Sequence, residues 1–101
     1  MSKPSLFSDI SDPCCYVCGN TYNLHRHHVF GGTGRRKVSE REGCWVYLCG
    51  PHHNQSNEGV HFNHELDTEL KQECQRRWEE REGIDDPEHK AFIALMGRNY
   101  L

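Results

Sequence analysis

The chain has 101 residues, of which 35% are hydrophobic and 27% are charged, and its formal net charge is −3 at pH 7. This length predicts one small domain, and the composition is ordinary for a folded, water-soluble protein, which excludes disorder throughout. The acidic balance argues against a protein that coats nucleic acid, because such proteins neutralise phosphates with lysine and arginine. No apolar run could span a membrane and no secretory signal is recognisable, so we expect a cytoplasmic protein with no membrane partner.

The first thirteen residues are polar, contain two prolines and show no hydrophobic period. We therefore expect a flexible arm over residues 1–13 and a single domain over residues 14–101. A domain of this size buries a modest core, so a structural metal would add useful stability.

Two pairs of metal-ligating residues stand near the start of the domain. Cys15 and Cys18 form the first pair, and Cys49 and His52 form the second at the same spacing. Six cysteines in a short chain would suggest disulfides in a secreted protein, but without a signal segment the spacing favours a metal. Three thiolates and one imidazole make a closed tetrahedral zinc site. The remaining cysteines are expected to be unreactive thiols: Cys14, Cys44 and Cys74.

The segment between the two pairs predicts a β-hairpin. Residues 24–30 and 44–48 are rich in β-branched, aromatic and other apolar residues and predict two strands. Residues 31–43 are rich in glycine and basic residues, and they predict a long loop between the strands. Alternate residues of a strand share a face, so the first strand should present His25 and His27 on one side and Arg26 and His28 on the other.

Three helices should follow the hairpin. Pro51 favours a helix start, and that helix should continue to about Gly59. Apolar residues at every fourth position predict an amphipathic helix over residues 64–82, and a shorter helix should cover residues 87–96. The chain is therefore expected to be an α+β protein, with a ββα unit over residues 14–60 followed by C-terminal helices.

The joint spacing of these motifs resembles the HNH endonucleases, whose core is a ββα-metal fold. The resemblance covers roughly residues 14–60, and it is most similar to zinc-supported, phage-encoded members such as the RecA-dependent phage nucleases. The motifs that carry it are Cys15-x-x-Cys18, Leu24-His25-Arg26-His27-His28-Val29-Phe30 and Tyr47-Leu48-Cys49-Gly50-Pro51-His52-His53-Asn54.

The resemblance implies a function and a role for each matched residue. It implies a metal-dependent DNA endonuclease in which His28 is the general base that activates water. The implied structural zinc ligands are Cys15, Cys18, Cys49 and His52. The implied ligands of a catalytic divalent ion (Mg²⁺, Mn²⁺, Ni²⁺ or Zn²⁺) are His27, His53 and Asn57. A neutral imidazole suits proton abstraction near pH 7, and the basic pair Arg35 and Arg36 is expected to bind neighbouring phosphates.

One feature departs from the family pattern. Many members place an asparagine on or just before the second strand to orient the general base, whereas residues 42–45 contain none. Ser39 or a backbone carbonyl is a candidate for holding the His28 ring instead. His25 is a rival metal ligand because it shares a strand face with His27.

Other interpretations remain open. The histidines are also compatible with a second structural site, and the arginines with a solvated loop. The alternative function is a zinc-finger-like adaptor that binds DNA or protein without turnover. DNA is the expected partner, and a phage or host recombination or packaging protein would recruit the domain, because its net charge of −3 limits its own affinity for DNA. The sequence leaves the oligomeric state and the DNA specificity open.

Overall fold

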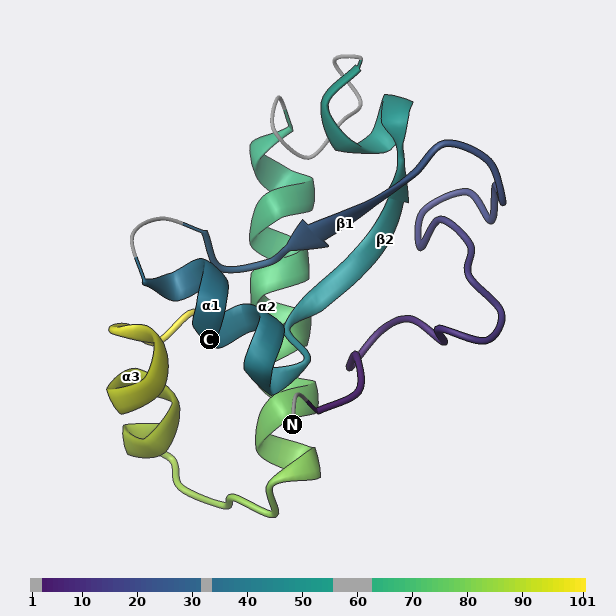
Figure 1. Ribbon diagram of the computed structural model, residues 1–101. Helices are drawn as coiled ribbons and strands as arrows, with labels where there is room; N and C mark the ends of the chain where they lie inside the picture. Colours follow the sequence, from purple (N-terminus) through teal and green to yellow (C-terminus); the bar gives the residue numbers. More distant parts are fainter. Residues whose placement is uncertain (1–2, 32–33, 56–62) are drawn as a thin grey trace.

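The computed structural model describes residues 3–31, 34–55 and 63–101. The described chain combines a two-stranded antiparallel sheet with helices, so the predicted α+β class is confirmed (Figure 1). In chain order the elements are β1 Leu24–His28, α1 Arg35–Glu42, β2 Trp45–Cys49, the π-helical turn η1 Pro51–Gln55, α2 His64–Arg81 and α3 Lys90–Met96. Within these ranges, none of the helices is both long and apolar enough to cross a bilayer.

The antiparallel register of the sheet places the two ends of the hairpin together. Leu24 lies opposite Cys49, and His28 lies opposite Trp45. The end of β2 is therefore beside the start of β1, close to where the first cysteine pair precedes that strand. In this way the pairing brings together two ligand pairs that are far apart in the sequence.

A helix connects the two strands, so the prediction of a loop over residues 31–43 is wrong for most of that segment. Helix α1 is flanked by Gly34 and Gly43, whose φ angles are 82° and 78°. Its arginine, lysine and glutamate residues are good helix formers, and the prediction gave too much weight to the flanking glycines. A Cβ at Gly43 would lie 2.0 Å from the carbonyl oxygen of Pro4, so a larger residue does not fit there.

Ser39 anchors α1 to the end of β1. Its hydroxyl donates a hydrogen bond to the carbonyl oxygen of Phe30 at 2.8 Å and accepts one from the Phe30 amide at 3.2 Å. Ser39 has no exposed surface, so these bonds satisfy a buried hydroxyl. They also fix the orientation of α1 relative to the strand that carries the histidines.

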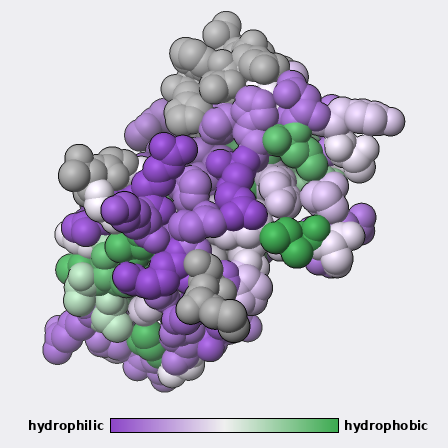
Figure 2. Space-filling model, viewed as in Figure 1, coloured by the Kyte–Doolittle hydropathy of each residue, from purple (hydrophilic) through white to green (hydrophobic). Residues whose placement is uncertain are grey.

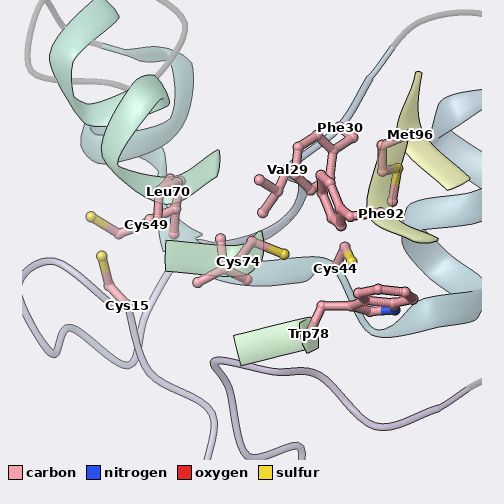
Figure 3. Packing of buried hydrophobic residues seen from close by; sticks show 12 residues of the cluster. Cys15, Val29, Phe30, Cys44, Cys49, Leu70, Cys74, Trp78, Phe92 and Met96 are labelled. Carbon is pink, nitrogen blue, oxygen red and sulfur yellow. The ribbon is translucent and has the colours of Figure 1, made fainter. Parts of the chain in front are cut away.

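The core lies between β2, the end of β1 and the C-terminal helices (Figure 3). Phe92 of α3 packs edge-to-face against Phe30 and Trp78, with ring centroids 5.5 and 5.6 Å apart. Such aromatic pairs contribute about 0.5–1.5 kcal/mol each beyond their buried area. On α2, Leu70, Cys74 and Trp78 form the buried stripe that fixes this helix against the sheet.

The two C-terminal helices have different starting signals. The Asn63 side chain accepts a hydrogen bond from the Leu66 amide at 3.1 Å, which caps α2 one residue before its first turn. Helix α3 begins at Lys90 rather than at the predicted Pro87. The Asp86 side chain accepts hydrogen bonds from the Glu88 and Lys90 amides, so this stretch forms a turn before the helix begins.

Part of the segment that was predicted as a flexible arm lies against the domain. The Leu6 amide donates to the Gly43 carbonyl at 2.9 Å, and the Tyr47 amide donates to the Ser8 hydroxyl at 3.0 Å. The Lys3 ammonium bridges the carboxylates of Glu42 and Glu82 at 2.8 and 2.9 Å. These contacts hold the N-terminal residues along β2 and α1, and in Figure 1 the purple N-terminal segment runs beside β2.

Candidate metal site and histidine pocket

The structure brings the four predicted zinc ligands together. The donor atoms of Cys15, Cys18, Cys49 and His52 all lie within 4.8 Å of one another. The Sγ atoms of Cys18 and Cys49 are 3.7 Å apart, and Nδ1 of His52 lies 3.8 Å from Sγ of Cys15 and 3.1 Å from Sγ of Cys49. A tetrahedral zinc would separate two sulfurs by about 3.8 Å and a sulfur from a nitrogen by about 3.6 Å. The group can therefore hold a metal ion and is compatible with a structural zinc.

A tight turn shapes the first half of this site. The Cys15 amide donates to the Asn20 carbonyl and the Gly19 amide donates to the Cys15 carbonyl, each at 2.8 Å. Gly19 has a φ of 77°, a backbone conformation that glycine adopts at low cost. The Tyr16 amide donates to the Tyr47 carbonyl at 2.9 Å, which ties the turn to β2. The two cysteines of the turn are thereby presented to the end of the hairpin.

The electrostatics of the thiols also suit a cation. Burial raises the pKa of Cys15, but hydrogen bonds from the backbone amides of Cys49, Cys18 and Val17 outweigh it and lower that pKa to about 7. Burial, together with the neighbouring thiols Cys18 and Cys15, raises the pKa of Cys49 to about 11, although a hydrogen bond from the His52 backbone lowers it in part. The two values move apart because a second thiolate beside the first is unfavourable. A cation among the donors would remove this conflict.

Three histidines meet beside the metal site. Nδ1 of His25 lies 2.8 Å from Nδ1 of His53, and the rings of His27 and His53 have centroids 5.3 Å apart. His25 and His27 extend from the same face of β1, as strand alternation predicts, and His53 reaches them from η1. His52 and His53 are consecutive, yet the first contacts the cysteines and the second contacts the other histidines.

His28 extends from the other face of β1 and is held by α1. Its Nε2 lies 2.7 Å from Oε2 of Glu40, and Arg26, from the same strand face, pairs with the other oxygen of that carboxylate. Burial raises the pKa of Glu40, but the bond from His28 and the charge of Arg26 outweigh it, so its net pKa lies below the ordinary value. Glu40 is therefore an anionic acceptor for His28, and the Ser39 hydroxyl that was a candidate for this role is bonded to Phe30 instead.

An open pocket of about 460 Å³ joins these side chains. It contains the three histidines predicted as catalytic, together with cationic side chains from three elements. Its lining residues are Arg26, His27, His28, Val29, Gly31, Arg36, His53, Asp67 and Lys71. The face shown in Figure 2 is largely hydrophilic around these elements. A hollow with imidazoles and cations is suited to a polar, anionic ligand rather than to an apolar one.

The two predicted phosphate-binding arginines have different surroundings. Arg36 lines the pocket, and its Nε lies 3.4 Å from Nδ1 of His28. Arg35 is not among the described residues that line the pocket, and its Nε donates to the carbonyl of Met96 at the end of α3 at 3.1 Å. Consecutive residues of a helix point about 100° apart, so only one of the two can face the pocket. Asn57, the third predicted ligand of a catalytic ion, lies outside the described residues.

Sequence reasoning missed Glu40, which holds His28, and two charged residues that line the pocket. The glycine-rich composition of residues 31–43 predicts a loop and so gives Glu40 no position, although Arg36 and Glu40 have the i, i+4 spacing of a helical pair. Asp67 and Lys71 have the same spacing on α2, but only the packing of that helix places them at the pocket.

The arrangement can bind an anionic group, and it supplies an oriented imidazole beside further potential metal ligands. Function is inferred from this chemistry and from the resemblance of the motifs. Comparisons of the chain with models of known protein families, with curated proteins and with solved structures gave no match.

Proposed function

We propose that the protein is a metal-dependent HNH-type endonuclease that hydrolyses phosphodiester bonds in DNA. The observation that carries the proposal is the pocket in which His27, His28 and His53 lie together next to the Cys₃His group. In this proposal β1, β2 and η1 form the ββα-metal core, and zinc occupies the Cys₃His group as a structural ion.

His28 acts as the general base. If its Nε2 carries the proton and donates to Glu40, its Nδ1 holds the lone pair, which accepts from Arg36 Nε at 3.4 Å in this structure. That Nδ1 can take a proton from water once Arg36 gives up this bond to bind a phosphate. The carboxylate of Glu40 fixes this tautomer and stabilises the positive charge that the ring gains. Glu40 therefore does the work that an asparagine does in many HNH enzymes, from the helix between the strands rather than from the second strand.

His27 and His53 would hold the catalytic divalent ion, and His25 lies close enough to His53 to share that role. Asn57 remains the proposed further ligand. Two or three imidazoles suit Zn²⁺, Ni²⁺ or Mn²⁺, while Mg²⁺ would need oxygen ligands from water and phosphate as well. When bound, the ion would offset the negative charge that develops on the phosphoryl group and the leaving oxygen.

Arg36 is placed to bind a phosphate beside His28, because it lines the pocket and lies within 3.4 Å of that ring. The formal net charge of −3 limits general affinity for DNA, so local cations must do most of the binding. Recruitment by a phage or host recombination or packaging protein would compensate for this low affinity, and we propose a phage origin on the resemblance of the motifs.

The test is plasmid cleavage by the zinc-loaded protein at neutral pH with added Mg²⁺, Mn²⁺ or Ni²⁺. We expect His28→Ala to lower the cleavage rate by about 10²–10⁴-fold, the usual contribution of a general base. His64→Ala is the matched control, because His64 is exposed at the start of α2 and does not line the pocket. Zinc content and circular dichroism must match the wild type in both variants.

Two results would contradict this proposal. Cleavage that survives in His28→Ala would remove His28 from the mechanism. A wild type that binds DNA but cuts under none of these metals, with or without a recombinase filament, would support the zinc-finger-like adaptor instead.

A further inference from the structure

Helix α2 contributes two charged side chains to the pocket, although it lies outside the segment that resembles HNH enzymes. Asp67 and Lys71 line the hollow, and their charged groups are 2.9 Å apart. Their side chains are only 27% and 26% exposed, whereas Lys90 on α3 is 73% exposed. The Lys71 ammonium is therefore partly enclosed at the pocket rather than extended into solvent.

Two other cations of α2 are paired with a glutamate of the same helix. Arg76 and Arg77 both bind Glu73, at 3.4 and 3.0 Å. Arg77 also donates to the carbonyl of Leu6 at 3.0 Å and so belongs to the N-terminal contact. Among the described residues of α2, Lys71 is thus the cation that reaches the pocket.

The C-terminal residues help to hold Lys71 in place. Its ammonium lies 5.8 Å from the centre of the Tyr100 ring. The Tyr100 backbone is fixed at both polar groups, because its amide donates to Gln75 at 2.8 Å and its carbonyl accepts from Gln72 at 3.1 Å. A lysine held between Asp67 and an aromatic ring loses less side-chain freedom when it binds a ligand than a free lysine does.

The chemistry of the pocket identifies the ligand group. Arg26 is held twice, by Glu40 and by the Trp45 ring, whose centre lies 3.9 Å from its guanidinium carbon. Arg36 from α1, which donates to the His28 ring, and Lys71 from α2, which pairs with Asp67, are the other two cations that line the pocket. An ammonium has three N–H donors, so Lys71 can keep Asp67 as one partner and donate to a phosphate oxygen with another. Two cations that approach from different helices suit successive phosphates of one strand better than a single terminal phosphate.

We propose that Lys71 binds a backbone phosphate of the nucleic acid that enters the pocket, so that the strand is held between α1 and α2. The proposal rests on the proposed nuclease function and deepens it, since it makes α2 and the C-terminal residues part of the substrate-binding surface. Lys71 acts in binding, while His28 acts on the bond that breaks.

The experiment measures binding of a short fluorescent DNA duplex by anisotropy over a series of salt concentrations, without chelator or added divalent ion. At about 0.1 M salt we expect Lys71→Ala to weaken binding roughly tenfold and to reduce the slope of log affinity against log salt by about 1, as for one lost phosphate contact. Lys71→Arg should restore both quantities. Lys90→Ala removes the same charge away from the pocket and should match the wild type.

A second variant separates a phosphate contact from a structural role. If Lys71 mattered only through its ion pair within α2, Asp67→Asn would weaken DNA binding as much as Lys71→Ala does. We expect Asp67→Asn instead to bind DNA at least as tightly as the wild type, because it removes a negative charge from the pocket. Thermal unfolding of each variant checks that the fold is retained.

Different results would overturn the Lys71 contact and the proposed nuclease function. A wild type that binds and cleaves DNA, while Lys71→Ala matches Lys90→Ala in affinity and salt slope, overturns the role of Lys71 and leaves the nuclease intact. A wild type that neither binds nor cleaves DNA overturns the proposed function and this inference with it.

Discussion

The Cys₃His group and the histidine pocket both use residues of the turn η1, but the first is a closed set of donor atoms and the second is an open pocket. In the first, four donor atoms within 4.8 Å face one another and include the buried Cys15 and Cys49. In the second, imidazoles, arginine and lysine line a hollow of about 460 Å³ that remains open. A closed donor set is typical of a structural metal and an open one of chemistry on a ligand. Of the consecutive residues of η1, His52 belongs to the closed donor set and His53 lines the open pocket.

The largest effect should come from removing a donor of the closed site. Cys18→Ala should lose the metal and unfold the domain or destabilise it by several kcal/mol, because binding of a structural metal is coupled to folding. Cys18 is exposed, so its loss leaves no cavity in the core. Metal content and circular dichroism melting are the measurements.

Cys14→Ala is the matched control, since Cys14 is also exposed and is next to the same turn. Equal metal content and melting temperature in wild type and Cys18→Ala would show that the group does not hold a stabilising ion.

The second-largest effect should come from a variant that alters the histidine pocket but leaves the Cys₃His group intact. His53→Ala should keep the structural metal and the fold but lower DNA cleavage by about 10²-fold or more, because His53 contacts His25 and His27 and is not one of the four clustered donors. Cleavage rates at several concentrations of the divalent ion provide the measurement. A His53→Ala protein that loses its zinc together with its activity would contradict the division of roles between the two consecutive histidines.

The smallest effect concerns the support of the general base. Glu40→Gln should retain fold and DNA affinity and lower the cleavage rate by about 10–100-fold, the usual range for a group that orients a reacting histidine. Glu69→Gln is a matched control, because Glu69 is an exposed glutamate on α2 that does not line the histidine pocket. A rate unchanged by Glu40→Gln would show that another group orients His28.

The two regions also differ in how far the sequence predicts them. The four metal ligands occur as two pairs at fixed spacing, and pairing of β1 with β2 is enough to bring them together. Strand alternation likewise predicts which histidines of β1 share a face. The contacts that α1 and α2 make at the pocket depend on helix rotation and packing, which the spacing of residues does not predict.

Arg35 and Arg36 illustrate the limit. Both belong to one basic run, but once that run is helical only Arg36 faces the pocket, while Arg35 binds the end of α3. Lys71 shows the same limit for α2. Its place at the pocket follows from the buried stripe that docks this helix, and the local sequence around the lysine does not predict it.

The Cys₃His group has a further consequence for the order in which the molecule assembles. Cys18 and Cys49 are separated by 31 positions, so an ion between them closes a loop that contains β1, α1 and β2. Such a cross-link restricts the unfolded chain and shortens the search for strand pairing. His28, Arg36 and Glu40 all lie inside this loop, whereas Lys71 lies beyond it. With an ion bound, one wall of the pocket would belong to a tethered segment, and the other would be added when α2 docks.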